Sequence, residues 1–145
     1  MKNFIKSNIS QESLAILLTQ APIALAMLME DDFVIKVANP QMLQMWGKQP
    51  EIIGLKLVDA LPELKDQKFI NILAKVKKTG VPFKGYKELA YVVRNGITEE
   101  CYFDFIYNPI YNDDESEIVG VSVVATESTE QVLAERKLKE TENKF

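Results

Sequence analysis

Apolar residues recur at helical spacing in the first half of the chain, and each such stretch is bounded by residues that favour helix ends. Ser10 can cap a first helix over residues 11–20, which Pro22 stops. A short second helix is expected from Asn39-Pro40 to Gly47, with Asn39 as the cap and proline at the first helical position. The clearest helix is expected from a cap at Asp66 to Gly80, which suits the left-handed residue after a helix.

In the second half the pattern becomes that of β-strands. Asn95-Gly96 is the strongest short hairpin dipeptide, and it separates two stretches rich in aromatic and β-branched residues. A polar turn then leads to one more strand and to a polar, helix-favouring segment over residues 131–144. The expected strands cover residues 23–29, 33–37, 83–93, 97–111 and 118–126.

The order of these elements is two strands, then helices, then three strands. This order indicates an α+β domain with one five-stranded antiparallel sheet and its helices on one face. On the longest strand, Phe103, Phe105 and Tyr107 share one face, whereas Tyr102 and Ile106 share the other. A sheet that is apolar on both faces needs cover on both. The amphipathic N-terminal helix or a second copy of the chain is available to cover the second face.

The amino-acid composition restricts the catalytic groups, cofactors and partners that the chain can have. The 145 residues fit one domain, and they include no histidine and one cysteine, Cys101. Imidazole catalysis, a histidine-ligated haem and a disulfide within the chain are thereby excluded. The net charge of −4 argues against a nucleic-acid partner. No signal peptide or membrane-spanning stretch is visible, so we expect a cytoplasmic chain without membrane contact.

Four segments stand out: Ala21-Pro22-Ile23-Ala24-Leu25-Ala26; Val37-Ala38-Asn39-Pro40 with Trp46-Gly47-Lys48 and Ile53-Gly54; Ala60-Leu61-Pro62-Glu63 with Thr79-Gly80-Val81-Pro82-Phe83; and Gly120 to Gln131. Taken together, these segments resemble the PAS domains that serve as input modules in bacterial sensor histidine kinases. Their residues fall in the order and at the spacing of that family over about residues 12 to 140. At the last junction Glu127 stands where the family most often has Asp, and Ser128 where it usually has an aliphatic residue.

The resemblance implies a PAS fold with strand order 2-1-5-4-3 and three parts: an N-terminal capping helix (1–21), the PAS core (22–127) and the start of a linker or signalling helix (128–145). It also implies that Glu127 and Thr129 couple the core to this exit helix. A ligand pocket is implied between the sheet and the helices. Its candidate lining residues are Met42, Met45, Trp46, Phe69, Leu73, Phe103, Phe105, Tyr107, Val121, Val123 and Ala125.

The residues assign no cofactor. Haem-binding members of the family generally use a histidine, which this chain lacks, and Cys101 has none of the Asn-Cys-Arg surroundings of the reactive cysteine in flavin-photoadduct members. We expect Cys101 to be a small apolar residue on a strand. No metal-ligand cluster is visible.

We expect a non-catalytic sensory module, part of a sensor histidine kinase. Its expected partners are a second copy of the chain, a downstream kinase domain and a small-molecule ligand. One alternative is a dimerisation or spacer module with no ligand and a solid interior. Another is a small enzyme, which would need Asp104 to face an enclosed cavity.

Overall fold

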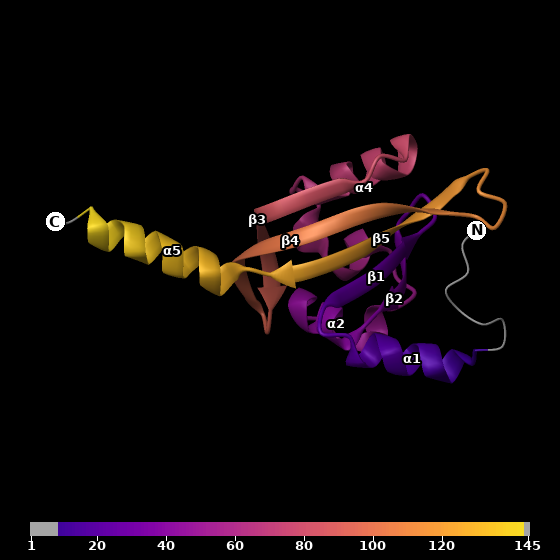
Figure 1. Ribbon diagram of the computed structural model, residues 1–145, viewed down its shortest axis with the longest axis horizontal. Coiled ribbons are helices and arrows are strands. Elements are labelled where there is room, and N and C mark those ends of the chain that lie inside the picture. Colours follow the sequence, from indigo (N-terminus) through magenta and orange to yellow (C-terminus); the bar gives the residue numbers. More distant parts are fainter. Residues whose placement is uncertain (1–8, 144–145) are drawn as a thin grey trace.

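The five strands form one antiparallel sheet in the order β2-β1-β5-β4-β3 (Figure 1). They appear in a computed structural model that describes residues 9–143. The strand order confirms the expected α+β fold. The strands are Ala24–Met29 (β1), Val34–Ala38 (β2), Phe83–Arg94 (β3), Ile97–Tyr111 (β4) and Ile118–Glu127 (β5).

Seven helical segments accompany the sheet in the described part of the chain. No helix within residues 9–143 is long and apolar enough to cross a membrane. The segments are α1 (Gln11–Gln20), α2 (Pro40–Trp46), the 3-10 turn η1 (Pro50–Ile52), α3 (Leu57–Ala60), the 3-10 turn η2 (Pro62–Leu64), α4 (Phe69–Thr79) and α5 (Thr129–Glu142).

The start of α4 differs from the expectation, because Asp66 does not cap it. The helix begins at Phe69, and Lys68 occupies the cap position without a side-chain hydrogen bond. The amide of Gln67 instead accepts from the backbone N–H of Tyr91 at 2.9 Å and donates to its carbonyl at 2.8 Å. Because these bonds tie Gln67 to the edge strand β3, the chain enters α4 only after it.

The β3–β4 hairpin forms where Asn95-Gly96 predicted it. Both turn residues have positive φ, 53° and 76°, as a two-residue hairpin turn requires. Farther along the hairpin the register shifts between Gly85 and Glu88. Lys87 lies in this bulge with φ at 51°. Its backbone N–H donates to the Asp104 carboxylate at 2.7 Å, which fixes the bulge.

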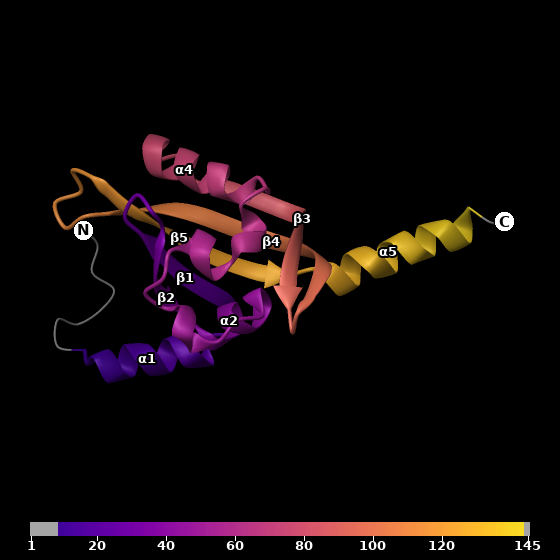
Figure 2. The ribbon, with the colours of Figure 1, turned by 180° about the vertical axis from the view of Figure 1, so that it is seen from behind.

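The helices α2, α3 and α4 and the two 3-10 turns lie on one face of the sheet (Figure 2). No described helix crosses the opposite face, which faces the viewer in Figure 1. Of the two covers that the sequence offers for this face, the N-terminal helix and a second copy of the chain, the described part of α1 does not lie over it. The helix lies along the edge of the molecule near α2 and leaves Ile16 and Leu17 50% and 61% exposed.

Candidate functional site: an apolar pocket and the exit junction

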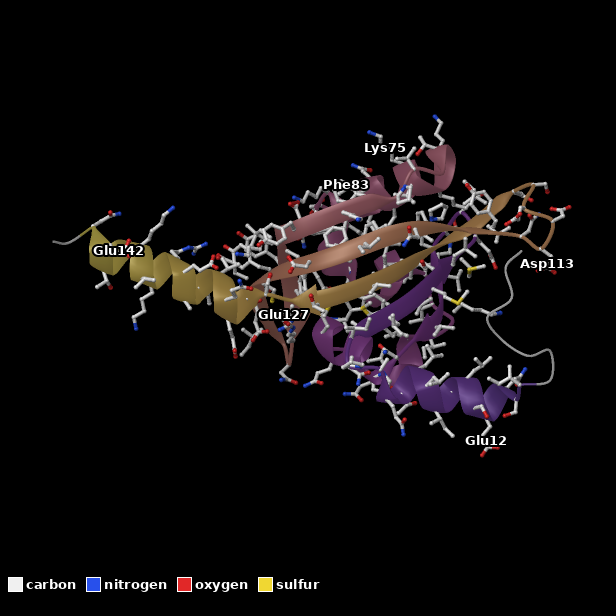
Figure 3. The ribbon with its side chains drawn as sticks, viewed as in Figure 1. Glu12, Lys75, Phe83, Asp113, Glu127 and Glu142 are labelled. Atoms are coloured by element: carbon white, nitrogen blue, oxygen red, sulfur yellow. The ribbon has the colours of Figure 1, made fainter. Side chains whose placement is uncertain are left out.

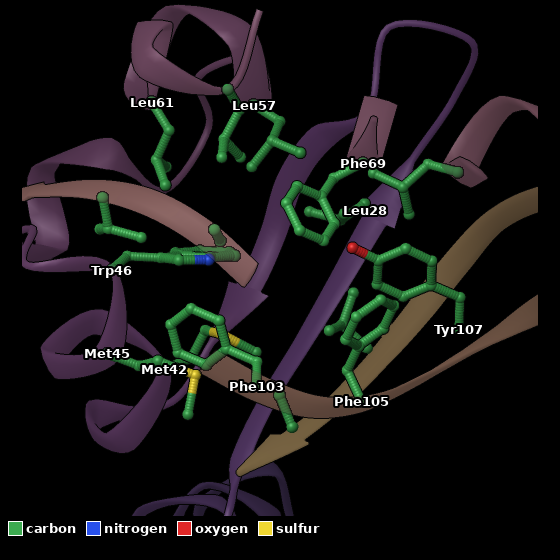
Figure 4. Close-up of a pocket in the computed structure, with 16 residues that line it drawn as sticks. Leu28, Met42, Met45, Trp46, Leu57, Leu61, Phe69, Phe103, Phe105 and Tyr107 are labelled. Atoms are coloured by element: carbon green, nitrogen blue, oxygen red, sulfur yellow. The ribbon is translucent and has the colours of Figure 1, made fainter. Parts of the chain in front are cut away.

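An apolar cavity of about 70 Å³ lies between the sheet and the helices (Figure 4). Alternate residues of β1, β3, β4 and β5 form its floor, and α2, α3, η2 and α4 form its walls. None of the described residues that line it is charged. They are Leu28, Met42, Met45, Trp46, Leu57, Leu61, Leu64, Phe69, Leu73, Ala90, Val92, Phe103, Phe105, Tyr107, Val123 and Ala125.

All the candidate lining residues except Val121 meet at this cavity. Val121 faces the same side of β5 but is fully buried in the core without reaching the cavity. Three further lining residues were not predicted from the sequence, although their alternate burial along β1 and β3 follows from strand geometry: Leu28, Ala90 and Val92. The three leucines of the α3–η2 region were not predicted either, because the helical segments there are too short to show a period.

A cluster of aromatic rings around Phe105 lies at one side of the cavity. The ring of Phe105 lies 4.6 Å from that of Tyr107 and 5.8 Å from those of Phe69 and Phe83, centroid to centroid. Gly85 on the neighbouring strand makes room for Phe105, because a Cβ there would come within 2.4 Å of the ring. This packing fixes the direction of the Tyr107 side chain.

Two polar atoms face the cavity, the Tyr107 hydroxyl and the Trp46 indole nitrogen. They point toward its middle from opposite sides (Figure 4). Tyr107 is 7% exposed. Within residues 9–143 neither atom has a hydrogen-bond partner. Burial raises the pKa of Tyr107, so that its hydroxyl stays protonated and can donate a hydrogen bond.

A second cluster of contacts lies at the exit junction, where β5 passes into α5 beside Glu127 (Figure 3). Arg94, at the end of β3, donates to the Glu127 carboxylate at 2.8 and 3.3 Å. Its Nε donates to the carbonyl of Met45 at 3.0 Å. Burial alone would lower the pKa of Arg94, but the hydrogen bonds and charge of Glu127 raise it above its ordinary value. Arg94 thus connects α2, which walls the cavity, to the junction.

Thr129 and Ser128 attach the start of α5 to β4. The Thr129 hydroxyl donates to Glu127 at 2.6 Å and accepts from the backbone N–H of Tyr102 at 3.0 Å. The backbone N–H of Ser128 donates to the carbonyl of Tyr102 at 2.7 Å. Both backbone groups of Tyr102 therefore bind the residues that open α5.

Two further contacts hold the second turn of α5. Lys87 pairs with Glu135 at 3.0 Å, and this contact raises the pKa of Lys87 and lowers that of Glu135. Arg136 donates to the Tyr102 hydroxyl at 2.6 Å. The bulge that Asp104 fixes therefore places a lysine against the exit helix.

Asp104 and Cys101 both lie outside the lining of the cavity. Asp104 points to the opposite face of β4, so the arrangement that an enzyme with an enclosed aspartate requires is not found. Cys101 is 1% exposed on β4, and burial raises the pKa of its thiol. As expected from the sequence, Cys101 packs as a small apolar residue.

Comparison with known families identifies this architecture. The family profile described as "PAS fold" matches residues 18–133. No curated protein matches the sequence.

Solved structures share the fold at low sequence identity. An RNA-binding light-oxygen-voltage receptor is 16% identical with a TM-score of 0.72, and the match covers 99% of this chain but only 39% of the receptor. The PAS domain of histidine kinase ThkA is 21% identical with a TM-score of 0.56, covering 72% of this chain and 97% of that domain. VqmA bound to DPO is 17% identical with a TM-score of 0.64, covering 81% of this chain and 57% of VqmA. At these identities the likeness shows the fold alone.

Proposed function

The chain belongs to the PAS family, and from this premise we propose that it is a non-catalytic sensory module of a cytoplasmic signalling protein. A change in the packing of the pocket is transmitted to the exit helix. The proposal extends to a kinase domain after α5, as in a sensor histidine kinase. The likeness to the PAS domain of ThkA supports this extension, whereas the likeness to VqmA and to a light-oxygen-voltage receptor leaves other outputs open.

One observation carries the proposal: the Arg94 side chain touches both the pocket wall and the exit junction. Its guanidinium binds the Met45 carbonyl at the end of α2 and the Glu127 carboxylate ahead of α5. A ligand or partner that favours one position of α2 therefore favours one position of Arg94. Because Glu127 also accepts from Thr129, that bias reaches the first turn of α5. The domain after α5 would read a change in helix position or stability.

Amide hydrogen exchange on this chain tests the coupling without a known ligand. Leu73→Ala enlarges the pocket from α4, which lies on the far side of the molecule from α5 (Figure 1). We expect exchange of the first hydrogen-bonded amides of α5, from Val132 onward, to change by about threefold or more. Amides near a helix end exchange by local opening, so loss of global stability alone does not alter their rates.

Val76→Ala is the matched control for this experiment. Val76 is 2% exposed on the same helix but does not line the pocket. It should leave exchange in α5 unchanged, and Arg94→Met should abolish the effect of Leu73→Ala. Equal effects of the two α4 substitutions on α5 would contradict the proposed coupling.

A second candidate function, homodimerisation through the outer face of the sheet, is favoured by the character of that face. Leu25, Met27, Ile106 and Val124 lie there on the three central strands, half-buried, with no described helix over them. Ile106 and Val124 are direct cross-strand neighbours, so they form one apolar patch. This function is compatible with a sensory role, because dimers can transmit a signal between two exit helices.

Light scattering tests the dimer. We expect Val124→Lys to halve the measured mass, because a charge at the centre of the patch opposes its burial. Ile53→Lys, at an exposed position in the loop after η1, is the control and should leave the mass unchanged. A chain that begins at Ala21 separates the roles of α1 and the sheet: an unchanged dimer removes α1 from the interface. A dimer that survives Val124→Lys would exclude this face.

A further inference from the structure

The pocket contains a feature that its packing does not explain. Tyr107 is nine-tenths buried, and its hydroxyl opens onto the cavity without a hydrogen-bond partner in the described part of the chain. Burying a hydroxyl unpaired is unfavourable, and a phenylalanine would fill the same space without that cost. The hydroxyl therefore indicates a polar atom from outside the chain at this point.

The second polar atom restricts what that partner can be. The Trp46 indole is a donor only, and it faces the cavity from the opposite side (Figure 4). Tyr107 is protonated and can also donate. Two donors that converge on one cavity are satisfied together by an acceptor oxygen. Among residues 9–143, no charged side chain lines the cavity to neutralise an ion, so the molecule that carries this oxygen is neutral.

The volume of the cavity limits the size of the ligand that carries this oxygen. Its volume of about 70 Å³ is roughly half that of an engineered apolar cavity of about 150 Å³ that binds benzene. The leucines of α3 and η2 and the aromatic rings leave no other polar contact in the lining. Since benzene has six non-hydrogen atoms, a body of about three non-hydrogen atoms without further polar groups fits these surroundings.

We propose that the pocket binds a small neutral molecule with an apolar body and one carbonyl or hydroxyl oxygen, which accepts hydrogen bonds from Tyr107 and Trp46. This inference rests on the proposed sensory function and specifies the class of ligand. The oxygen makes the polar contacts, and burial of the apolar body provides the driving force. Because Trp46 lies at the end of α2, the same contact positions the helix that Arg94 joins to the exit junction.

Acetone and isobutene form a matched pair of probes, because they have the same shape and differ only in the carbonyl oxygen, which isobutene replaces with a methylene group. Trp46 is the single tryptophan, so its indole N–H gives one NMR signal that reports on the pocket. Acetone loses more hydration than isobutene on entering the pocket, so the effect of each substitution is compared for each probe separately. We expect acetone to move the indole proton signal downfield, as a hydrogen bond to the indole N–H implies, whereas isobutene should not. Acetate, an anion of similar size, should not bind.

Tyr107→Phe should weaken the binding of acetone severalfold, while isobutene binds as before. In the ligand-free protein this variant should keep or raise Tm, because it removes an unpaired hydroxyl. Tyr86→Phe, at an exposed tyrosine of β3, is the control and should leave both affinities unchanged.

An unchanged affinity for acetone in Tyr107→Phe would overturn the proposal, because it would show that the hydroxyl does not bond the oxygen of the probe. A loss of Tm in ligand-free Tyr107→Phe would overturn it too, since it would show that the hydroxyl is already bonded. Neither outcome contradicts the proposed coupling between the pocket and the exit helix, because the exchange experiment on Leu73→Ala tests that coupling with no probe present.

Discussion

Asn39→Ala is expected to lower the free energy of unfolding by about 3 kcal/mol, as measured by urea denaturation. Asn39 is 3% exposed and caps α2, where its Oδ1 accepts from the backbone N–H of Met42 at 3.0 Å. The same oxygen accepts from the N–H of Leu25 at 2.9 Å, and the Nδ2 donates to the carbonyls of Leu18 and Ile23 at 3.1 and 2.9 Å. Alanine leaves all four backbone groups without this partner, and three of them lie outside α2.

Two variants separate the cap from the other bonds. Asn39→Asp keeps the acceptor but places a carboxylate against two carbonyl oxygens, so it should also cost about 2 kcal/mol or more. Ser10→Ala removes only a cap, that of the exposed helix α1, and should cost about 1 kcal/mol or less. If Asn39→Ala costs no more than Ser10→Ala, Asn39 acts as a cap alone.

Asn39 also shows how far the sequence could predict this structure. The cap, the following proline and the glycine after α2 depend on neighbouring residues, so the sequence predicts them. The amide's bonds to Leu18 and Ile23 depend on α1 and β1 lying beside α2, and no local pattern encodes that. The β3–β4 hairpin could be predicted for the same local reason, through Asn95-Gly96.

The predicted cap of α4 at Asp66 is wrong because a contact between distant segments fixes the start of this helix. Asp66 has the composition of a cap, but the bonds of Gln67 to Tyr91 on β3 fix the preceding turn. A tertiary contact therefore overrides a local preference. The lining of the pocket could likewise be predicted only in part. Strand alternation locates Phe103, Phe105 and Tyr107, whereas the leucines of α3 and η2 reach the cavity because of the path of the chain, which no local pattern encodes.

Arg94 could not be identified from the sequence, because each of its partners lies far along the chain. Nothing around the β3–β4 turn indicates the Met45 carbonyl or the Glu127 carboxylate. The resemblance did point to Glu127 and Thr129 as coupling residues, and the structure places them in contact with each other. Their role in signalling stays a prediction.

Gly47→Ala is expected to cost about 3 kcal/mol of folding free energy and to alter the exit junction as well. Gly47 has φ at 68°, so alanine is strained there by about 1 kcal/mol or more whatever surrounds it. A Cβ would also lie 2.5 Å from Cγ and 2.9 Å from Cα of Arg94. Because one of these atoms is backbone, β3 or the end of α2 has to move, and the bond from Arg94 to Met45 is disturbed.

Gly96→Ala isolates the steric part of this effect. Gly96 has φ at 76°, close to that of Gly47, but a Cβ there meets nothing within 4 Å. It should therefore cost only the strain, about 1 kcal/mol, and leave hydrogen exchange in α5 unchanged. Denaturation followed by circular dichroism avoids the change in Trp46 fluorescence that a substitution at the neighbouring residue causes. Equal costs for the two variants, or unaltered α5 exchange in Gly47→Ala, would show that contact between α2 and Arg94 does not control the exit helix.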